Sequence, residues 1–465
     1  MAPESAAPAR PAASAPADWP VPVTGWGRTS ASSARLVRPR SYEDAAEAVR
    51  GWALPGARGG IPRGLGRAHG DAAQSAGGAV LDMTALNRVH VIDVATGTLL
   101  TDAGVSLARL AEVLLPHGWF LPVSPGSGQV TVGGAIGADV HGLGHRTAGS
   151  FARHLLSLEL LTADGEVRTV PRGTPLFDAT TGGLGLTGAV LTATLRLLRV
   201  ETSLLTVETE RAPDLDDLLH RMSTSAPPRR YEAAWIDLLA RGRSTGRAAL
   251  LRADHLPARE LPSRARRAAA ALGPGQGPYP PRQLAPGPLG LRATGAWQGL
   301  RLRALPRAGT RRLCELDAFF HPRDTPPHGP HHRGGLIRYE CLLPYEAQRT
   351  LERLVRRLAR RGCPAPLALL RRFGEGDPGW LSFAAPGWSL CLDLPARLPG
   401  LAAFLDRLDE EVAAAGGRVR LAEDARLRPD LLAAMYPRLT EFRELRRTLD
   451  PRGLFASDLS RRLDL

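Results

Sequence analysis

The sequence contains no lysine, so all 60 of its basic residues are arginine. Schiff-base chemistry and a lysine general base are therefore excluded. The formal net charge is +14, but the arginines are interleaved with acidic residues, as in residues 351–357, which is typical of solvated helix faces. We therefore expect no nucleic-acid partner, although an arginine-rich protein that binds surfaces stays an alternative.

Cysteines and long apolar runs are also scarce. The four cysteines lie far apart without a CxxC pair, which fits a reducing compartment and gives no zinc signature. No run approaches the roughly 18 apolar residues of a membrane span, and the Ala/Pro-rich residues 1–24 lack the apolar core of a signal peptide. We expect a disordered tail over residues 1–24, a cytoplasmic protein and no metal site, with His328, His331 and His332 in a proline-flanked loop.

The pattern of apolar residues and glycines along the sequence changes near residue 200. Before it, short apolar runs alternate with glycine-rich turns. The spacing predicts strands over residues 79–83, 90–94 and 98–105, and a helix over residues 107–115. It also predicts a hairpin over residues 158–170, with Asp164-Gly165 as its turn. After it, helical patterns over 346–361 and 401–415 alternate with strand candidates such as 388–394.

This mixture of strands and helices predicts an α+β fold. The length of 465 residues exceeds the roughly 250–300 residues of a single core, which predicts at least two domains. We place them at residues 25–200 and 201–465, with a flexible Pro/Gly/Arg-rich stretch near 256–310.

Three glycine-rich segments lie in the first half, at residues 63–71, 125–142 and 181–188. Glycine lets backbone N–H groups approach phosphate oxygens closely, and a segment with little side-chain volume leaves room for a large flat ligand. The first segment alone is equally compatible with a plain turn. Three such segments in one domain favour a dinucleotide.

These segments, together with Asp82-Met-Thr-Ala-Leu-Asn-Arg and Asp450-Pro, resemble the vanillyl-alcohol-oxidase superfamily. The resemblance implies a two-subdomain FAD-binding domain, a C-terminal α+β substrate domain with an antiparallel sheet, and FAD as the cofactor. It also implies the cofactor-binding residues, which are Arg63, Gly64, Leu65, Gly66, Arg67, Ala68, His69, Gly70, Gly126, Thr131, Val132, Gly133, Gly134, Ala138, His141 and Val190.

Within the superfamily, the motifs resemble flavoenzymes of cell-wall arabinan biosynthesis. That resemblance implies oxidation of a sugar hydroxyl to a ketone by hydride transfer to flavin. The substrate would be a sugar or a lipid-linked sugar, with at most peripheral contact at the inner face of the membrane and a ketosugar reductase as partner. The alternative is an oxygen-using alditol or sugar oxidase, because His69 stands where related oxidases bond covalently to the flavin. Simple packing of His69 against the ring stays open.

The candidates for catalysis are His141, Glu423 and Asp393. Histidine and carboxylate can accept the hydroxyl proton, while Asp393 shares a strand face with Cys391. His141 could instead only position the flavin, and Glu423 could be a surface ion-pair partner of Arg420 or Arg426. Glu423 stands where the family has a lysine, which disfavours a substrate phosphate. By resemblance, the substrate pocket comprises Phe320, Arg338, Glu340, Arg371, Ser389 and Cys391, with the cysteine as a lining residue.

Overall fold

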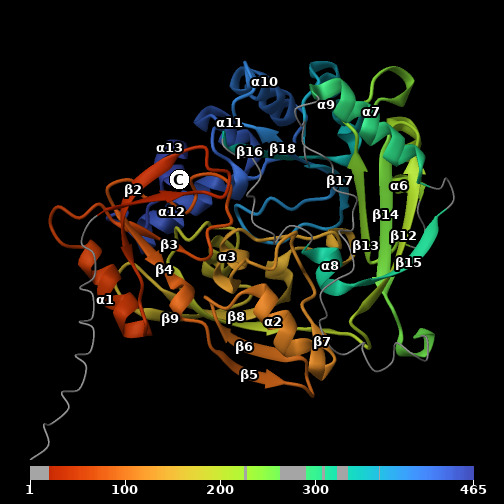
Figure 1. Ribbon diagram of the computed structural model, residues 1–465. Coiled ribbons are helices and arrows are strands. Elements are labelled where there is room, and N and C mark those ends of the chain that lie inside the picture. The colour runs from red at the N-terminus through yellow and green to blue at the C-terminus, as the bar shows by residue number, and fades with distance from the viewer. Residues whose placement is uncertain (1–19, 225–227, 262–289, 306–308, 322–333, 366) are drawn as a thin grey trace, which may run out of the picture.

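The computed structural model describes residues 20–224, 228–261, 290–305, 309–321, 334–365 and 367–465 (Figure 1). The first lobe is a mixed sheet in the order β1–β2–β4–β3, formed by Val21–Thr24, Ala31–Val37, Ala79–Asp82 and Gly60–Arg63. Helix α1 (Tyr42–Trp52) begins at a capping box between Ser41 and Asp44. It buries Val49 and Trp52 in a small core with Leu81 of β4.

The second lobe is an antiparallel sheet in the order β5–β6–β10–β8–β9, formed by Val89–Asp93, Thr98–Asp102, Ala189–Arg196, Leu155–Leu161 and Val167–Pro171. The predicted hairpin around Asp164-Gly165 is confirmed, because β8 pairs with β9 in antiparallel register. Helices α2 (Leu107–Leu114) and α3 (Val132–Gly137) contribute to the core of this lobe. A two-stranded ladder pairs β7 (Trp119–Phe120) with β11 (Leu198–Arg199), which ends just before the predicted boundary at residue 200.

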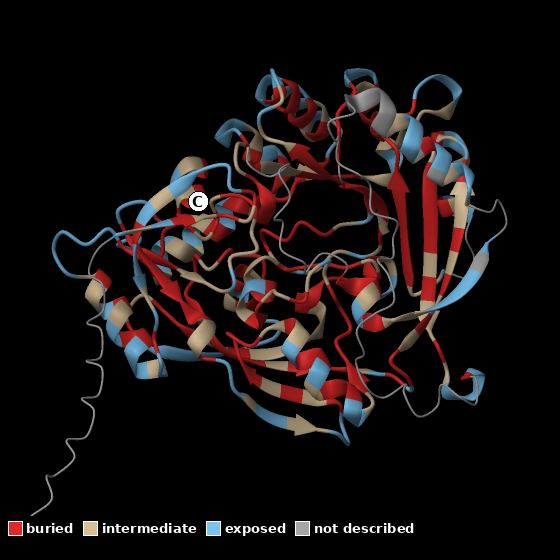
Figure 2. Ribbon diagram, in the orientation of Figure 1, coloured by how far each residue is buried: buried red, intermediate tan, exposed pale blue. Residues whose placement is uncertain are grey.

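The C-terminal half contributes an eight-stranded sheet in the order β15–β12–β14–β13–β17–β18–β16–β19, in which every pair is antiparallel. Its strands are Thr310–Glu315, Leu204–Ala212, Ala248–His255, Tyr231–Ile236, Leu367–Phe373, Gly387–Pro395, Leu336–Leu343 and Arg418–Val419. The central strands are buried along most of their length (Figure 2).

The two faces of this sheet differ in their neighbours. Helices α6 (Leu215–Thr224), α9 (Gln348–Arg361) and α10 (Leu401–Ala414) pack on one face, where they share a core with Leu390 and Leu392 of β18. Because side chains alternate along a strand, Ser389, Cys391 and Asp393 lie on the opposite face. The predicted shared face of Cys391 and Asp393 follows from this alternation.

The C-terminal segment returns to the first lobe, as the blue and red segments show (Figure 1). Phe455 forms a parallel β-bridge with Gly60 and an edge-to-face contact with Trp52 at 5.2 Å between ring centroids. The chain after residue 450 therefore packs on the cofactor half. The sequence instead predicts that all of residues 201–465 belong to the substrate domain. The remaining helices are α4 (His145–Ala148), α5 (Pro175–Thr180), α7 (Gly290–Arg303), α8 (Leu316–Phe320), α11 (Pro429–Met435), α12 (Leu439–Leu449) and α13 (Asp458–Leu463).

Two boundary predictions need correction. Residues 1–19 of the expected tail lie outside the described residues, but Val21–Thr24 pairs with β2, so ordered structure begins before residue 25. Within the stretch 256–310, residues 262–289 and 306–308 lie outside the described residues, whereas Gly290–Arg303 forms helix α7. The histidines at 328, 331 and 332 also lie outside the described part. None of the helices in the described ranges is long and apolar enough to cross a membrane.

Candidate active site

A cavity lies between the glycine-rich loops and the inner face of the eight-stranded sheet. The volume of this cavity is about 300 Å³. From the N-terminal half, the predicted cofactor residues that line it are Arg63, Gly64, Leu65, Gly66, Arg67, Ala68, His69, Gly126, Thr131, Gly133, Gly134, Ala138, His141 and Val190. From the C-terminal half, the lining includes Phe320, Arg338, Glu340, Arg371, Cys391 and Glu423. Two sets of residues, predicted separately for cofactor and substrate, thus meet in one space.

Four predicted site residues lie behind the lining rather than in it. Val132 is fully buried in the core of the second lobe. A Cβ atom on Gly70 would lie 1.6 Å from the Asp424 carbonyl oxygen, so this glycine permits close backbone packing. Ser389 and Asp393 hold lining arginines, as described below. These four residues support the cavity instead of forming its surface.

The glycines that line the cavity test whether FAD fits. A Cβ atom on Gly126 would meet nothing within 4 Å, so the space beside this loop is open. A Cβ atom on Gly64 would lie 2.1 Å from Thr131 Oγ1, so only glycine lets the first two loops meet. Thr131 also begins α3 by accepting a hydrogen bond from the Gly134 N–H at 3.1 Å. The cradle has open space for a flat ring system beside Gly126, and FAD therefore fits it.

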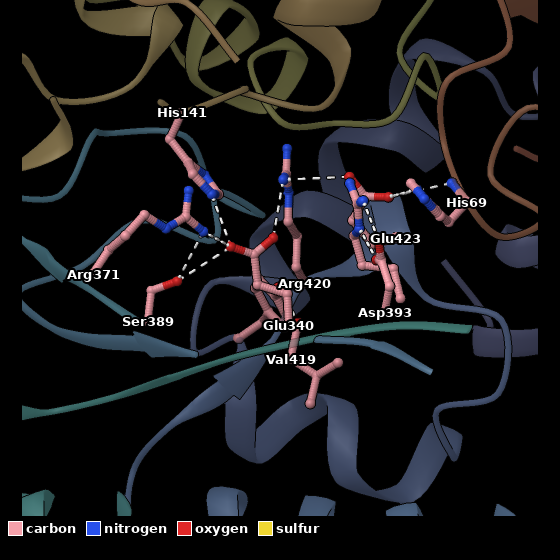
Figure 3. A network of polar contacts seen from close by, with 11 residues as sticks. His69, His141, Glu340, Arg371, Ser389, Asp393, Val419, Arg420 and Glu423 are labelled. Atoms are coloured by element: carbon pink, nitrogen blue, oxygen red, sulfur yellow. Dashed lines mark hydrogen bonds and ion pairs between the residues drawn. The ribbon is translucent and has the colours of Figure 1, made fainter. Parts of the chain in front are cut away.

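Glu340 is the centre of a buried polar network (Figure 3). One carboxylate oxygen lies 2.9 Å from His141 Nε2 and accepts hydrogen bonds from Arg371 and from Ser389 Oγ at 3.2 Å. The other accepts from Arg420 Nη1 at 3.1 Å. Burial alone would raise the pKa of Glu340, but His141 and the two arginines lower it well below its usual range. Glu340 is therefore ionised and joins the two halves of the molecule.

Glu423 forms the second buried pair of the site. Its Oε2 lies 2.5 Å from His69 Nδ1, and its Oε1 lies 3.4 Å from Arg420 Nη1. Burial alone would raise the pKa of Glu423, but His69 and then Arg420 lower it to about 2. The expected ion pair of Glu423 with Arg420 is present, but its expected place at the surface is wrong, because Glu423 is buried in the cavity wall. Arg420 bridges this pair to the Glu340 network (Figure 3).

His141 is buried against aromatic rings. Phe373 and Phe383 lie 4.7 and 5.6 Å from its ring centroid. Burial and then Arg420 lower the pKa of His141 to about 3, against the opposing effect of Glu340. Its Nε2 is bonded to Glu340, and its buried Nδ1 has no hydrogen-bond partner within the described ranges. Its low pKa makes His141 a weak base and its free Nδ1 is enclosed, so the flavin-positioning interpretation suits this ring better than that of a proton acceptor.

The cross-strand register explains the remaining contacts. Arg338 lies directly opposite Asp393, which accepts two of its N–H groups at 2.7 and 3.0 Å. Arg371 lies opposite Ser389 and donates to its Oγ at 3.1 Å. Burial raises the pKa of Cys391 to about 12, so its thiol stays protonated. Asp393 thus holds an arginine, and Cys391 lines the pocket as a protonated thiol.

Sequence reasoning missed several lining residues. Arg420 was a partner candidate only, although its spacing of three residues from Glu423 could have placed it in the site. The guanidinium of Arg67 lies 3.9 Å from the ring centroid of Trp26, which also lines the cavity. Trp235, Phe319, Leu367 and Leu369 also line the cavity, and no local sequence pattern predicts them there. No group of metal-ligating side chains occurs among the described residues.

Comparisons with known proteins agree with this geometry. The model of the FAD binding domain family matches residues 33–171. Decaprenylphosphoryl-β-D-ribose oxidase of Mycolicibacterium smegmatis is 39% identical over 453 residues, which cover 95% of the chain and 97% of the relative. The chain belongs to this family of FAD-dependent oxidoreductases. An uncharacterized protein in the mprA 5′ region of Streptomyces coelicolor is 56% identical over 373 residues, which cover 78% of the chain and all of that protein.

A solved structure supports the fold of this oxidoreductase family member. Physcomitrella patens BBE-like 1 superposes with a TM-score of 0.66 at 16% identity, covering 93% of the chain and 92% of that structure. The predicted α+β fold of the vanillyl-alcohol-oxidase type is confirmed, as is FAD as the cofactor of an oxidoreductase. The roles of individual site residues stay predictions.

Proposed function

We propose that this FAD-dependent oxidoreductase oxidises a hydroxyl group of a sugar to a carbonyl. The observation that carries the proposal is one cavity that joins the glycine-rich cradle to the polar inner face of β16, β17 and β18. Bound FAD supplies the acceptor for the hydride of the carbinol carbon. The substrate would lie between that acceptor and the side chains of the sheet. Family membership supports the same reaction class.

The hydroxyl proton needs an acceptor, and we assign it to Glu423 with His69. Glu423 is ionised at neutral pH, the form a base requires, and His69 shares its Oε2. Its low pKa makes it a weak base on its own. The adjacent imidazole offers a second position for the proton. His141 acts as a positioning residue beside Glu340 in this scheme.

The other residues bind and orient. Arg338, Arg371 and Arg420 would donate hydrogen bonds to substrate hydroxyl groups, while Phe320 and Cys391 would pack against its apolar edges. The predicted cofactor residues of the three loops would hold FAD. A ketosugar product would require a reductase to consume it. A lipid-linked sugar would bring the protein to the inner face of the membrane.

A second candidate is an oxygen-using sugar oxidase with FAD bonded covalently to His69. It is favoured by one observation: Glu423 occupies Nδ1, while Nε2 has no hydrogen-bond partner among the described residues and its ring lines the cavity. An ionised carboxylate only accepts hydrogen bonds, so Nδ1 carries the proton and Nε2 keeps its lone pair. His69 Nε2 would therefore form the covalent bond to the flavin.

The test is an anaerobic screen of the FAD-loaded protein. Neutral sugars, alditols, nucleosides and prenyl-phosphosugars are each added, and loss of the oxidised flavin absorbance is followed. Reduction of the flavin by at least one class of sugar supports the proposal. If none of these compounds reduces the flavin, the proposal is wrong. Peroxide formation in air then distinguishes the oxidase candidate from an enzyme that needs an added acceptor.

A further inference from the structure

Three arginines reach the cavity from the C-terminal half, and each is paired with a buried carboxylate. Asp393 accepts two hydrogen bonds from Arg338. Glu340 accepts from Arg371 and Arg420, and Glu423 lies 3.4 Å from Arg420. The carboxylate side chains are only 9%, 1% and 10% exposed, in the order Asp393, Glu340 and Glu423. Three guanidinium groups thus meet three carboxylates.

The formal charges of these six groups cancel. Arginine is always protonated, and both glutamates are ionised because their cationic neighbours lower their pKa values. The positive charge of the protein as a whole therefore does not extend into this wall of the cavity. An anion that entered would lose its hydration without meeting a free counter-charge.

The same arrangement leaves hydrogen-bonding capacity. Within the described ranges, Arg371 Nη1 and Arg420 Nη2 make no hydrogen bond, and neither atom is among the fully enclosed unpaired atoms. Glu423 Oε1 has Arg420 as its neighbour at 3.4 Å. The wall therefore offers N–H donors and a carboxylate acceptor without net charge. Hydroxyl groups, which donate and accept, match this combination.

We propose that Glu340 and Glu423 are specificity-determining residues that make the cavity select an uncharged polyhydroxyl substrate and reject a phosphate beside the reacting carbon. This inference rests on the proposed oxidation of a hydroxyl. It separates the chain from its relative, whose name carries a phosphoryl group on the ribose. Arg338, Arg371 and Arg420 serve as hydroxyl donors and not as an anion site.

Calorimetric titration of the FAD-loaded protein with inorganic phosphate tests the proposal. The wild-type protein should show no saturable binding in the cavity. Glu340→Gln keeps the size of the side chain and removes its charge, which frees Arg371 and leaves Arg420 with Glu423 alone, so phosphate should bind at least ~10-fold more tightly than to the wild type. The gain should disappear in the double variant Glu340→Gln/Arg371→Gln. Glu423→Gln is a second variant if the first does not hold FAD.

Glu232→Gln is the matched control. Glu232 is a buried carboxylate of the same sheet that accepts a hydrogen bond from Arg252 at 2.9 Å, and it does not line the cavity. Its loss should leave phosphate binding unchanged. A second arm compares D-ribose with D-ribose 5-phosphate as reductants of the wild-type flavin, and the neutral sugar should be the better one.

The outcomes separate this inference from the proposed function. Saturable phosphate binding in the wild type, or equal phosphate affinity in wild type and both glutamine variants, would overturn it. Faster flavin reduction by the phosphate ester than by the free sugar would also overturn it. If no sugar reduces the flavin, the proposed function fails, while the calorimetric arm still decides the charge argument because it does not depend on turnover.

Discussion

Glu423 Oε2 lies 2.5 Å from His69 Nδ1, although the two residues are 354 positions apart in the chain. The His69 backbone N–H points to the same oxygen at 3.3 Å. One carboxylate therefore fixes both the backbone and the ring of a residue in the first glycine-rich loop. This pair therefore joins the cofactor half to the C-terminal half in the wall of the cavity.

The covalent candidate predicts that FAD stays with the protein after acid precipitation. The washed wild-type pellet should be yellow, and a flavin-bearing peptide should contain His69 bonded through Nε2. His69→Ala should release all its flavin to the supernatant. A colourless wild-type pellet would rule out the covalent bond and leave the non-covalent reading of the site.

Glu423→Gln should slow flavin reduction by the substrate about 100-fold or more, because it removes the proposed proton acceptor. The flavin spectrum should persist, since the cradle itself is unchanged. Glu410→Gln is a control, because Glu410 pairs with Arg428 at the surface and lies outside the cavity. Rapid mixing under anaerobic conditions measures the rate, and equal rates in the two variants would remove Glu423 from catalysis.

The rate of flavin reduction at saturating substrate should show no inflection between about pH 5 and pH 8. The pKa of Glu423 is about 2 and that of His141 is about 3, so both groups keep their unprotonated form throughout that window. Lowering the pH through 6.5, the usual pKa of a histidine side chain, should therefore leave the rate of flavin reduction unchanged. A fall in rate centred near that pH would mean that a group other than Glu423 or His141 accepts the proton.

Gly126→Val should give a folded protein with little FAD. The added side chain meets no neighbouring atom within 4 Å, but it projects into the space that the ring system needs. Gly51→Val is the matched control, because a Cβ atom there also meets nothing and Gly51 lies in α1, away from the cavity. Flavin content per protein and circular dichroism together check the result. Full FAD content in the Gly126 variant would place the ring elsewhere.

Asp139→Asn should flatten the pH dependence of stability. Burial and then the neighbouring Asp377 raise the pKa of Asp139 to about 6, above its usual 3.8. The folded state therefore binds this proton more tightly, and its contribution to stability falls as the pH rises from about 4 to about 6, by roughly 3 kcal/mol. Denaturant unfolding at pH 4.5 and pH 7 should show a smaller difference in the variant. An unchanged difference would contradict the raised pKa.

Some features could be predicted because their signals are local. Helices α9 and α10 follow from apolar spacing, and the β8–β9 hairpin follows from Asp164-Gly165 between two apolar runs. The return of Phe455 to Gly60 could not be predicted, since a single parallel bridge leaves no periodic pattern. Nor did composition indicate that helix α7 would form within the Pro/Gly/Arg-rich stretch.

By itself, the sequence determined the cofactor cradle, because glycine at fixed spacing is a backbone requirement that each loop carries within its own few residues. Only the tertiary structure decided the polar wall of the cavity. The partners of Glu340 are His141, Arg371, Ser389 and Arg420. The register of β16, β17 and β18 and the packing of the two halves of the molecule bring them together. Which charges cancel depends on distances of a few ångströms between segments far apart in the chain, and no local pattern encodes those distances.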